Sequence, residues 1–148
     1  MRIALDTNVL VYYEGVNDEA KQRFAVDLLD RMDKQTLVLP TQVIGELFNV
    51  LARRTQLPSD EVRATVLEWF DGCEVISSTA AVMANAIDIA SMHKLNIWDA
   101  VIVGAAAEAE CQLLLSEGMQ DGILWRGVTV ANPFAATMHP LLASALAP

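Results

Sequence analysis

The sequence has few cysteines and no long apolar segment. Cys73 and Cys111 are the only two cysteines among 148 residues, and their wide separation favours free thiols in a reducing compartment. No apolar run reaches the roughly 18 residues of a membrane-spanning helix. The N-terminus does not combine a charged start, a long apolar centre and a cleavage site. We therefore expect a cytoplasmic protein without a signal peptide or a membrane partner.

Aromatic residues are also scarce, at 6%, although 53% of the residues are hydrophobic and the mean hydropathy is +0.33. The core should therefore consist mostly of Leu, Val, Ile and Ala. A chain of this length fits one domain with a full core. The apolar excess indicates either a surface buried against a partner or a second copy, or a helix-rich core.

Positive charge is in short supply, because 10 Lys and Arg face 19 Asp and Glu and the formal net charge is −9. The overall field of such a chain repels nucleic acid. A substrate that carries phosphates would need a local basic strip or bound cations to offset this repulsion.

Short apolar runs alternate with segments of helical periodicity. The pattern predicts strands at 2–5, 36–40, 73–76, 111–116 and 127–134. It predicts helices at 7–14, 18–33, 42–55, 59–70 and 79–93, and one more that "LNIWDA" opens and that runs to about residue 109. This alternation favours a three-layer αβα fold with a central, mostly parallel five-stranded sheet. We expect a domain over 1–134 and a tail rich in Ala, Leu and Pro over 135–148.

Polar residues follow several of the predicted strands. Asp6 ends the first strand, and Glu46 lies on the helix after the second. Ser116, Glu117 and Asp121 follow the fourth. Because ligands bind at the carboxyl ends of parallel strands, these residues define a candidate site.

Each acid also has a purely structural interpretation. Asp6 can cap the helix that follows it. Glu46 can pair with Arg53 or face solvent. Asp99 falls in the first turn of a helix that Asn96 can cap, where a carboxylate stabilises the helix dipole by roughly 0.3–1 kcal/mol. Taken singly, each acid leaves both interpretations open.

Taken together, the acids come from separate segments that can meet at one edge of a sheet. Clustered carboxylates repel one another and raise their own pKa values, and a hard cation relieves that cost. Oxygen ligands suit Mg²⁺ or Mn²⁺. Such an ion activates water and clamps a phosphate oxygen, which is the chemistry of phosphodiester hydrolysis.

Four motifs in order carry a resemblance to a known family: "ALDTNVLVYY" at 4–13, "VIGELFNVL" at 43–51, "NIWDAVIVGAA" at 96–106 and "CQLLLSEGMQDG" at 111–122. They resemble the PIN-domain family and, within it, the VapC-type toxins of bacterial toxin–antitoxin pairs. The resemblance covers about residues 1 to 134. It implies a parallel sheet between helices and a Mg²⁺- or Mn²⁺-dependent ribonuclease.

The resemblance also assigns roles to residues. Asp6, Glu46 and Asp99 match the first three acids of the family site. Thr7 matches the small hydroxyl residue beside the first acid, and Ser116 matches the Ser or Thr after the fourth strand. Three acids can hold a single ion, directly or through water, even without a fourth.

The fourth acid departs from the family pattern. Similar chains read like "SEDLQDG" in this segment, and the position of their Asp is Gly118 here. Glu117 and Asp121 flank it, and either can substitute through a shifted loop. Without a substitute, one of two metal sites would be weakened.

Further residues and partners follow from the proposed chemistry and the resemblance. Asn8 can orient Asp6. Arg53, Arg54 and Lys94 are candidates for binding RNA phosphates, although solvated surface charges are the simpler interpretation. The family implies a cognate antitoxin, and homodimers are usual in it.

Two alternatives remain at the sequence level. Haloacid-dehalogenase-like phosphatases also place an Asp after the first strand, but they need a second Asp two residues later, where this chain has Asn8. The other alternative is a PIN-like binding module whose catalytic site has decayed at Gly118.

Overall fold

The computed structural model describes all 148 residues. It contains the strands β1 (Ile3–Leu5), β2 (Leu37–Pro40), β3 (Glu74–Ile76), β4 (Leu113–Leu115), β5 (Leu124–Trp125) and β6 (Val128–Ala131). Its helices are α1 (Thr7–Tyr13), α2 (Glu19–Asp30), α3 (Thr41–Arg54), α4 (Ser59–Gly72), α5 (Ala80–His93), α6 (Ile97–Glu108) and α7 (Pro140–Leu146), with a short 3₁₀ turn at Lys34–Thr36. None of these helices is both long enough and apolar enough to span a membrane.

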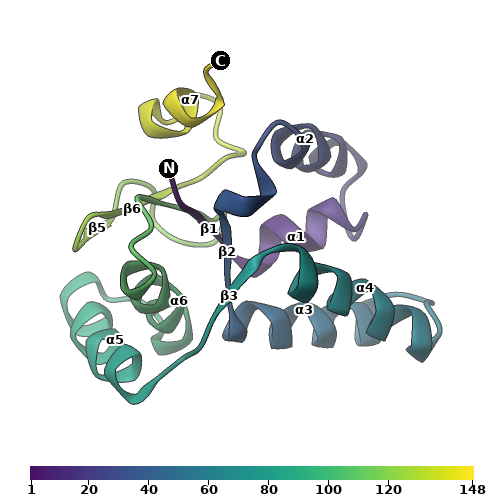
Figure 1. Cartoon of the computed structure of the whole chain (residues 1–148), viewed down its shortest axis with the longest axis horizontal. Coiled ribbons are helices and arrows are strands. Elements are labelled where there is room, and N and C mark those ends of the chain that lie inside the picture. The colour runs from purple at the N-terminus through teal and green to yellow at the C-terminus, as the bar shows by residue number, and fades with distance from the viewer.

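One sheet joins all the strands in the order β3-β2-β1-β4-β6-β5, and helices cover it on both faces (Figure 1). The predicted three-layer fold with a mostly parallel sheet is therefore confirmed. β1 and β4 lie side by side at its centre, with Ile3 opposite Leu113 and Ala4 opposite Leu114. All residues of these two strands are buried, as expected for strands covered on both faces.

The number of strands differs from the prediction, because the sheet has six rather than five. The additional strand, β5, pairs antiparallel with β6. Arg126 and Gly127 connect them with φ values of 45° and 87°, which is the conformation of a tight two-residue hairpin turn. Two residues are too few to show an alternating pattern, so sequence periodicity could not reveal β5.

Helix α6, which carries Asp99 in its first turn, packs in the interior of the molecule. Its residues from Ala100 to Ala106 are all buried, so this helix lies inside the molecule rather than on its surface. A Cβ atom at Gly104 would lie 3.2 Å from the backbone oxygen of Val82 in α5. Glycine thus permits the close approach of α5 and α6, which Figure 1 shows side by side.

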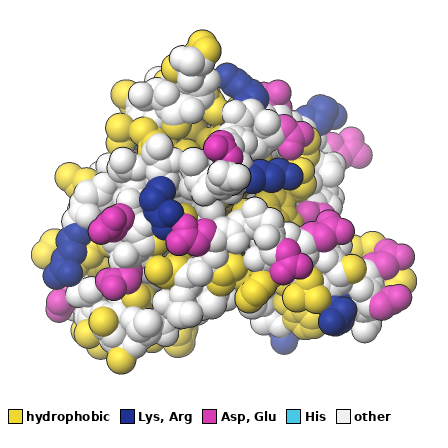
Figure 2. Space-filling model, in the orientation of Figure 1, with side chains coloured by type: hydrophobic (Ala, Val, Ile, Leu, Met, Phe, Trp, Pro, Cys, Tyr) yellow, Lys and Arg dark blue, Asp and Glu magenta, His cyan; other side chains and the backbone are white.

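The C-terminal segment includes helix α7. Its first turn is capped by His139, whose Nδ1 atom accepts a hydrogen bond from the backbone N–H of Leu141 at 3.1 Å. Leu142 is fully buried and joins the main core. On the outer surface, acidic and basic side chains are interspersed without a continuous basic strip on the face that Figure 2 shows.

Candidate functional site

The candidate site lies where the strand order changes direction. β2 and β3 are on one side of β1, while β4 and β6 are on the other, and open α/β sheets bind ligands at such a point, beyond the carboxyl ends of the strands. A cavity of about 270 Å³ occupies this position. It is lined by Asp6, Thr7, Asn8, Val11, Tyr12, Asn17, Glu46, Val50, Arg54, Asp99 and Gly118.

Asp6 is buried just after β1, and its two carboxylate oxygens accept hydrogen bonds from different donors. Oδ1 accepts a hydrogen bond from the backbone N–H of Thr7 at 2.7 Å, so Asp6 caps α1. Oδ2 accepts one from the hydroxyl of Ser116 at 2.6 Å and one from the amide of Asn8 at 3.4 Å. The sheet register makes the Ser116 contact possible, because β1 and β4 are adjacent and parallel.

Glu46 reaches the cavity from the second turn of α3. The Thr7 hydroxyl donates to its Oε2 at 3.2 Å, and the amide of Gln42 donates to its Oε1 at 2.9 Å. Gln42 lies one helical turn before Glu46, so this contact follows from helix geometry. The Glu46 side chain is therefore held by donors on both oxygens. The alternative of a pairing with Arg53 is not among the salt bridges of the chain.

Asp99 enters from the first turn of α6, whose N-cap is Asn96 as the sequence predicts. Desolvation raises the pKa of Asp99, and the nearby charge of Glu46 adds to this effect. Desolvation likewise raises the pKa of Asp6 to about 6, although hydrogen bonds from Ser116 and Thr7 oppose the shift; repulsion from Asp99 and Glu46 adds to it. The three carboxylates thus interact electrostatically across one cavity, and none has a salt-bridge partner.

The arrangement supplies oxygen donors for a hard cation. No three His, Cys, Asp or Glu side chains lie close enough together to ligate one ion as they stand. Mg²⁺ usually keeps several waters and uses only one or two carboxylates. The donor chemistry and the repulsion between uncompensated carboxylates therefore fit a partly hydrated divalent ion.

Several other residues predicted for the site occupy different positions. Glu117 forms an ion pair with Lys21 and accepts a hydrogen bond from the Tyr12 hydroxyl at 2.6 Å. Burial opposes a low pKa for Glu117, but these two contacts lower it. Asp121 is exposed, and its Oδ1 accepts from the backbone N–H of Asn132 at 2.8 Å. Neither acid lines the cavity.

Of the three basic residues predicted to bind RNA phosphates, one lines the cavity. Arg54 lines the cavity, whereas Arg53 and Lys94 do not. Gly118 lines the cavity too, and a Cβ atom placed there would meet only the Nδ2 atom of Asn8, at 3.5 Å. The position can therefore accept a side chain without a steric clash at Cβ.

Sequence reasoning missed three polar residues of the site. Gln42 could have been found, because it precedes Glu46 by one helical turn. Tyr12 lies within a quoted motif but has no distinguishing pattern. Asn17 lines the cavity with a positive φ of 77°, and the identity of a single residue in a loop does not reveal this conformation.

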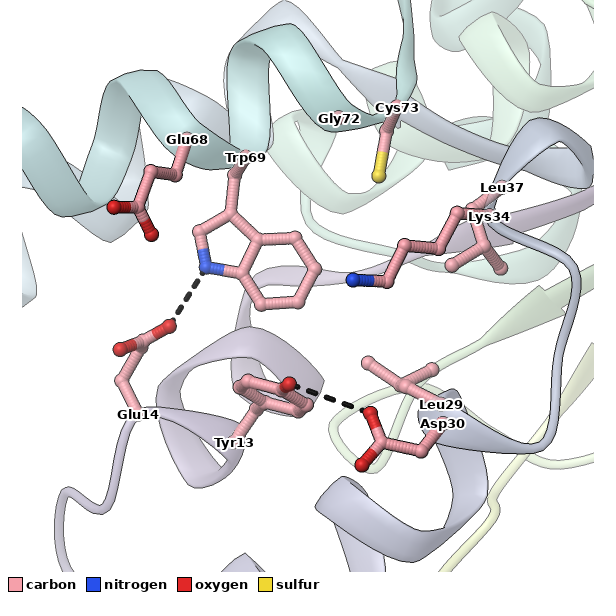
Figure 3. Close-up of a pocket in the computed structure, with 10 residues that line it drawn as sticks. All are labelled: Tyr13, Glu14, Leu29, Asp30, Lys34, Leu37, Glu68, Trp69, Gly72 and Cys73. Atoms are coloured by element: carbon pink, nitrogen blue, oxygen red, sulfur yellow. Dashed lines mark hydrogen bonds between the residues drawn. The ribbon is translucent and has the colours of Figure 1, made fainter.

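A second, smaller cavity of about 120 Å³ lies away from this site (Figure 3). Two of its acids already have partners, since the indole N–H of Trp69 donates to Glu14 at 2.8 Å and the Tyr13 hydroxyl donates to Asp30 at 3.5 Å. None of the predicted site residues lines this cavity. The acidic cavity at the strand ends is therefore the better candidate for chemistry.

Comparisons with known proteins identify relatives of this fold. A family model described as the PIN domain matches residues 3–119. The chain is similar to a toxin–antitoxin complex from Klebsiella pneumoniae, with a TM-score of 0.68 and 17% identity over 89% of this chain and 98% of that chain. No protein with a curated description matches it.

Two further solved structures are similar. One is the toxin VapC20 of Mycobacterium tuberculosis, described as cleaving the sarcin–ricin loop, with a TM-score of 0.64 and 19% identity over 76% of this chain and 86% of that chain. The other is FitAB bound to a DNA fragment, with a TM-score of 0.71 and 20% identity over 93% of this chain and 99% of that chain. At these identities, the likeness establishes the fold.

Proposed function

This chain belongs to the PIN domain family, and from that premise we propose that it is a divalent-metal-dependent endoribonuclease that hydrolyses RNA phosphodiester bonds. We further propose that it is the toxin of a toxin–antitoxin pair and works in the cytoplasm. The observation that carries the proposal is the convergence of Asp6, Glu46 and Asp99 on one cavity without an ion pair to any of them. Carboxylates in this state favour the binding of a cation.

The residues around the cavity have distinct roles in this proposal. Asp6, Glu46 and Asp99 hold Mg²⁺ or Mn²⁺, directly or through water. When bound, such an ion lowers the pKa of a coordinated water and polarises a phosphate oxygen. Ser116 and Asn8 keep Asp6 in place through their hydrogen bonds.

Thr7 and Gln42 orient Glu46 toward the same cavity through their bonds to its two oxygens. Arg54 is the basic residue that lines the cavity, and it offsets part of the charge of an RNA phosphate. Arg53 and Lys94 lie outside the cavity lining and would act only on more distant phosphates. Glu117 and Asp121 are not assigned as metal ligands in this proposal. Glu117 pairs with Lys21, and Asp121 accepts a hydrogen bond from Asn132.

Partners follow from the family and its structural relatives. A similar structure from Klebsiella pneumoniae is described as a toxin–antitoxin complex, and one from Rickettsia felis as VapBC2 bound to a DNA fragment from their promoter. We propose a cognate antitoxin for this chain on that basis. A homodimer is consistent with the exposed large apolar side chains of Phe48, Ile87 and Met92.

A binding module without catalytic activity remains the second candidate. Gly118 on the cavity wall favours it, since neither neighbouring acid takes the place of the missing carboxylate there. The phosphatase alternative has no such support, because residue 8 is Asn and the chain is a member of the PIN family. Metal binding and RNA cleavage distinguish the two remaining candidates.

Calorimetric titration with Mn²⁺ tests the proposed function. We expect the unmodified chain to bind the ion, and Asp99→Asn to weaken binding at least about tenfold because it removes one carboxylate from the cavity. Asp121→Asn serves as the matched control and should bind like the unmodified chain. Gly118→Asp should bind more tightly or take up a second ion.

Cleavage of single-stranded RNA is measured with the same proteins. Metal binding without any cleavage, together with cleavage in Gly118→Asp, would favour the catalytically impaired binding module. An unmodified chain that binds no Mn²⁺ would refute the nuclease proposal.

A further inference from the structure

An open groove adjoins the acidic cavity on the side of β3. Its volume is about 580 Å³, and it is lined by Thr41, Gln42, Gly45, Glu46, Asn49 and Ser78. None of these side chains is hydrophobic, and Glu46 is the only charged one. The groove therefore differs from both cavities described above, each of which has apolar walls as well as several acids.

The sheet order places the groove beside the acidic cavity. Asp6 follows β1, Thr41 follows β2, and Ser78 lies two residues beyond the end of β3. Because these parallel strands are neighbours, the three residues stand in a row along the carboxyl edge of the sheet. Glu46 lines both the cavity and the groove, so a ligand that leaves the cavity past Glu46 enters the groove.

The groove offers hydrogen bonds without adding negative charge. The Asn49 amide is exposed and makes no hydrogen bond within the chain. The hydroxyls of Thr41 and Ser78 lie 3.4 Å apart, and Thr41 bonds to the backbone of Ser78 rather than capping α3. Amides and hydroxyls are the groups that read the edges of unpaired bases and contact ribose 2′-hydroxyls.

Gly45 lines the groove without a side chain, so the helix backbone is exposed there. It is an exposed residue inside α3, and a Cβ atom there would have no neighbour within 4 Å. Packing within this chain therefore does not require glycine at this position, although glycine destabilises a helix relative to alanine. A bare backbone in a groove permits the close approach of another molecule.

We propose that this groove binds the nucleotides of a single-stranded RNA next to the scissile phosphate, with Asn49 contacting a base and Gly45 providing the space for it. This inference rests on the proposed ribonuclease function, because the acidic cavity defines where the scissile phosphate lies. Glu46 is the only carboxylate in the groove. A polyanion that extends from the cavity into the groove therefore meets little additional repulsion.

Two substitutions test the groove, and a third provides a matched control. Gly45→Ala fills the floor with a methyl group, and Asn49→Ala removes the free amide. Gly72→Ala makes the same change as Gly45→Ala near the end of another helix, α4, where a Cβ atom is equally unobstructed. The probe is a fluorescently labelled single-stranded RNA octamer of random sequence in Mg²⁺, whose binding is followed by anisotropy and whose cleaved ends are sequenced.

We expect Gly45→Ala and Asn49→Ala each to raise the Kd for RNA about fivefold or more. A change of this size corresponds to the loss of roughly one hydrogen bond or an equivalent contact. Asn49→Ala should also change which bases flank the cleaved bond. Both variants should bind Mn²⁺ like the unmodified chain. Gly72→Ala should change neither the Kd nor the cleavage pattern.

The results separate this proposal from the proposed function. Unchanged RNA affinity and cleavage pattern in Gly45→Ala and Asn49→Ala would overturn the groove proposal, and Mn²⁺ binding by the unmodified chain would still support the nuclease. An unmodified chain that binds Mn²⁺ but not the octamer would overturn the groove proposal as well. A changed sedimentation coefficient in Gly45→Ala with unchanged RNA affinity would identify the groove as a contact between two copies of the chain, which also overturns it.

Discussion

Asp6 serves the fold and the candidate site at once. As a helix cap it accepts from the N–H of Thr7, and as a cavity residue it faces Asp99 and Glu46. The structural and functional interpretations of this acid are therefore not exclusive, because its two oxygens point to different partners. Burial without an ion-pair partner makes the charged form costly, and carboxyl groups with such perturbed pKa values cluster at functional sites.

The raised pKa of Asp6 leads to a prediction about stability without metal. The folded carboxyl binds its proton more tightly than the unfolded one, so the free energy of unfolding falls as the pH rises between about 4 and 6. The full penalty, on the order of 3 kcal/mol, is present above pH 6. Asp6→Asn removes it, and the stability of this variant relative to the unmodified chain should rise by about that amount between pH 4 and pH 7.

Urea unfolding in EDTA at several pH values measures this difference. Asp121→Asn changes an exposed acid outside the cavity and serves as the matched control. A stability difference for Asp6→Asn that stays constant from pH 4 to pH 7 would contradict the prediction.

Among the elements, α6 positions the third acid of the site. Its buried middle holds it in the core, and its first turn presents Asp99 to the cavity. Asn96 caps this turn by accepting from the N–H of Trp98 at 2.8 Å. Order in the first turn of α6 is therefore a condition for the position of Asp99.

Loss of this cap should affect both stability and metal affinity. We expect Asn96→Ala to lower the free energy of unfolding by about 1 kcal/mol and to weaken Mn²⁺ binding, because the turn that carries Asp99 frays. Thr79→Ala removes the N-cap of the neighbouring helix α5 and should cost similar stability without changing Mn²⁺ affinity. Equal effects of the two substitutions on calorimetric Mn²⁺ binding would show that the cap of α6 has no special role.

At the scale of the whole molecule, the sheet order decides which residues meet. β1 lies between β2 and β4, so residues that follow β1, β2 and β4 share one edge although they are more than 100 positions apart at the extreme. The division into a domain over 1–134 and a tail over 135–148 remains a prediction. Helix α7 lies in that tail, and its Leu142 joins the core of the domain.

The burial of Leu142 predicts that the tail contributes to stability. Leu142→Ala should lower the free energy of unfolding by about 2–5 kcal/mol, since it leaves a cavity in the core. Leu146→Ala changes a partly exposed leucine of the same helix and should cost less. Chemical denaturation compares the two variants, and equal losses would argue against a specific role for Leu142.

Sequence patterns sufficed where a signal is contained in a few neighbouring residues. The apolar runs that became β1 and β4, and the N-cap at Asn96, all depend on local periodicity or on one side chain beside a helix start. The candidates Asp6 and Asp99 also emerged in this way, because each lies at or just beyond a recognisable boundary, whereas Glu46 lies inside the helix that follows β2. Their roles in metal binding and catalysis remain proposals.

Other features exist only between residues that are distant in the chain. The ion pair of Glu117 with Lys21 removes an expected acid from the site, and no local pattern announces it. The groove between Asn49 and Ser78 likewise depends on β2 and β3 being neighbours. The sequence by itself determined most of the strands and helices, though not β5 or α7, and the acids near their ends, because those choices are made by local backbone preferences and burial. Only the tertiary structure decided which of these acids share a cavity, because strand order, register and the packing of the helices bring distant side chains together.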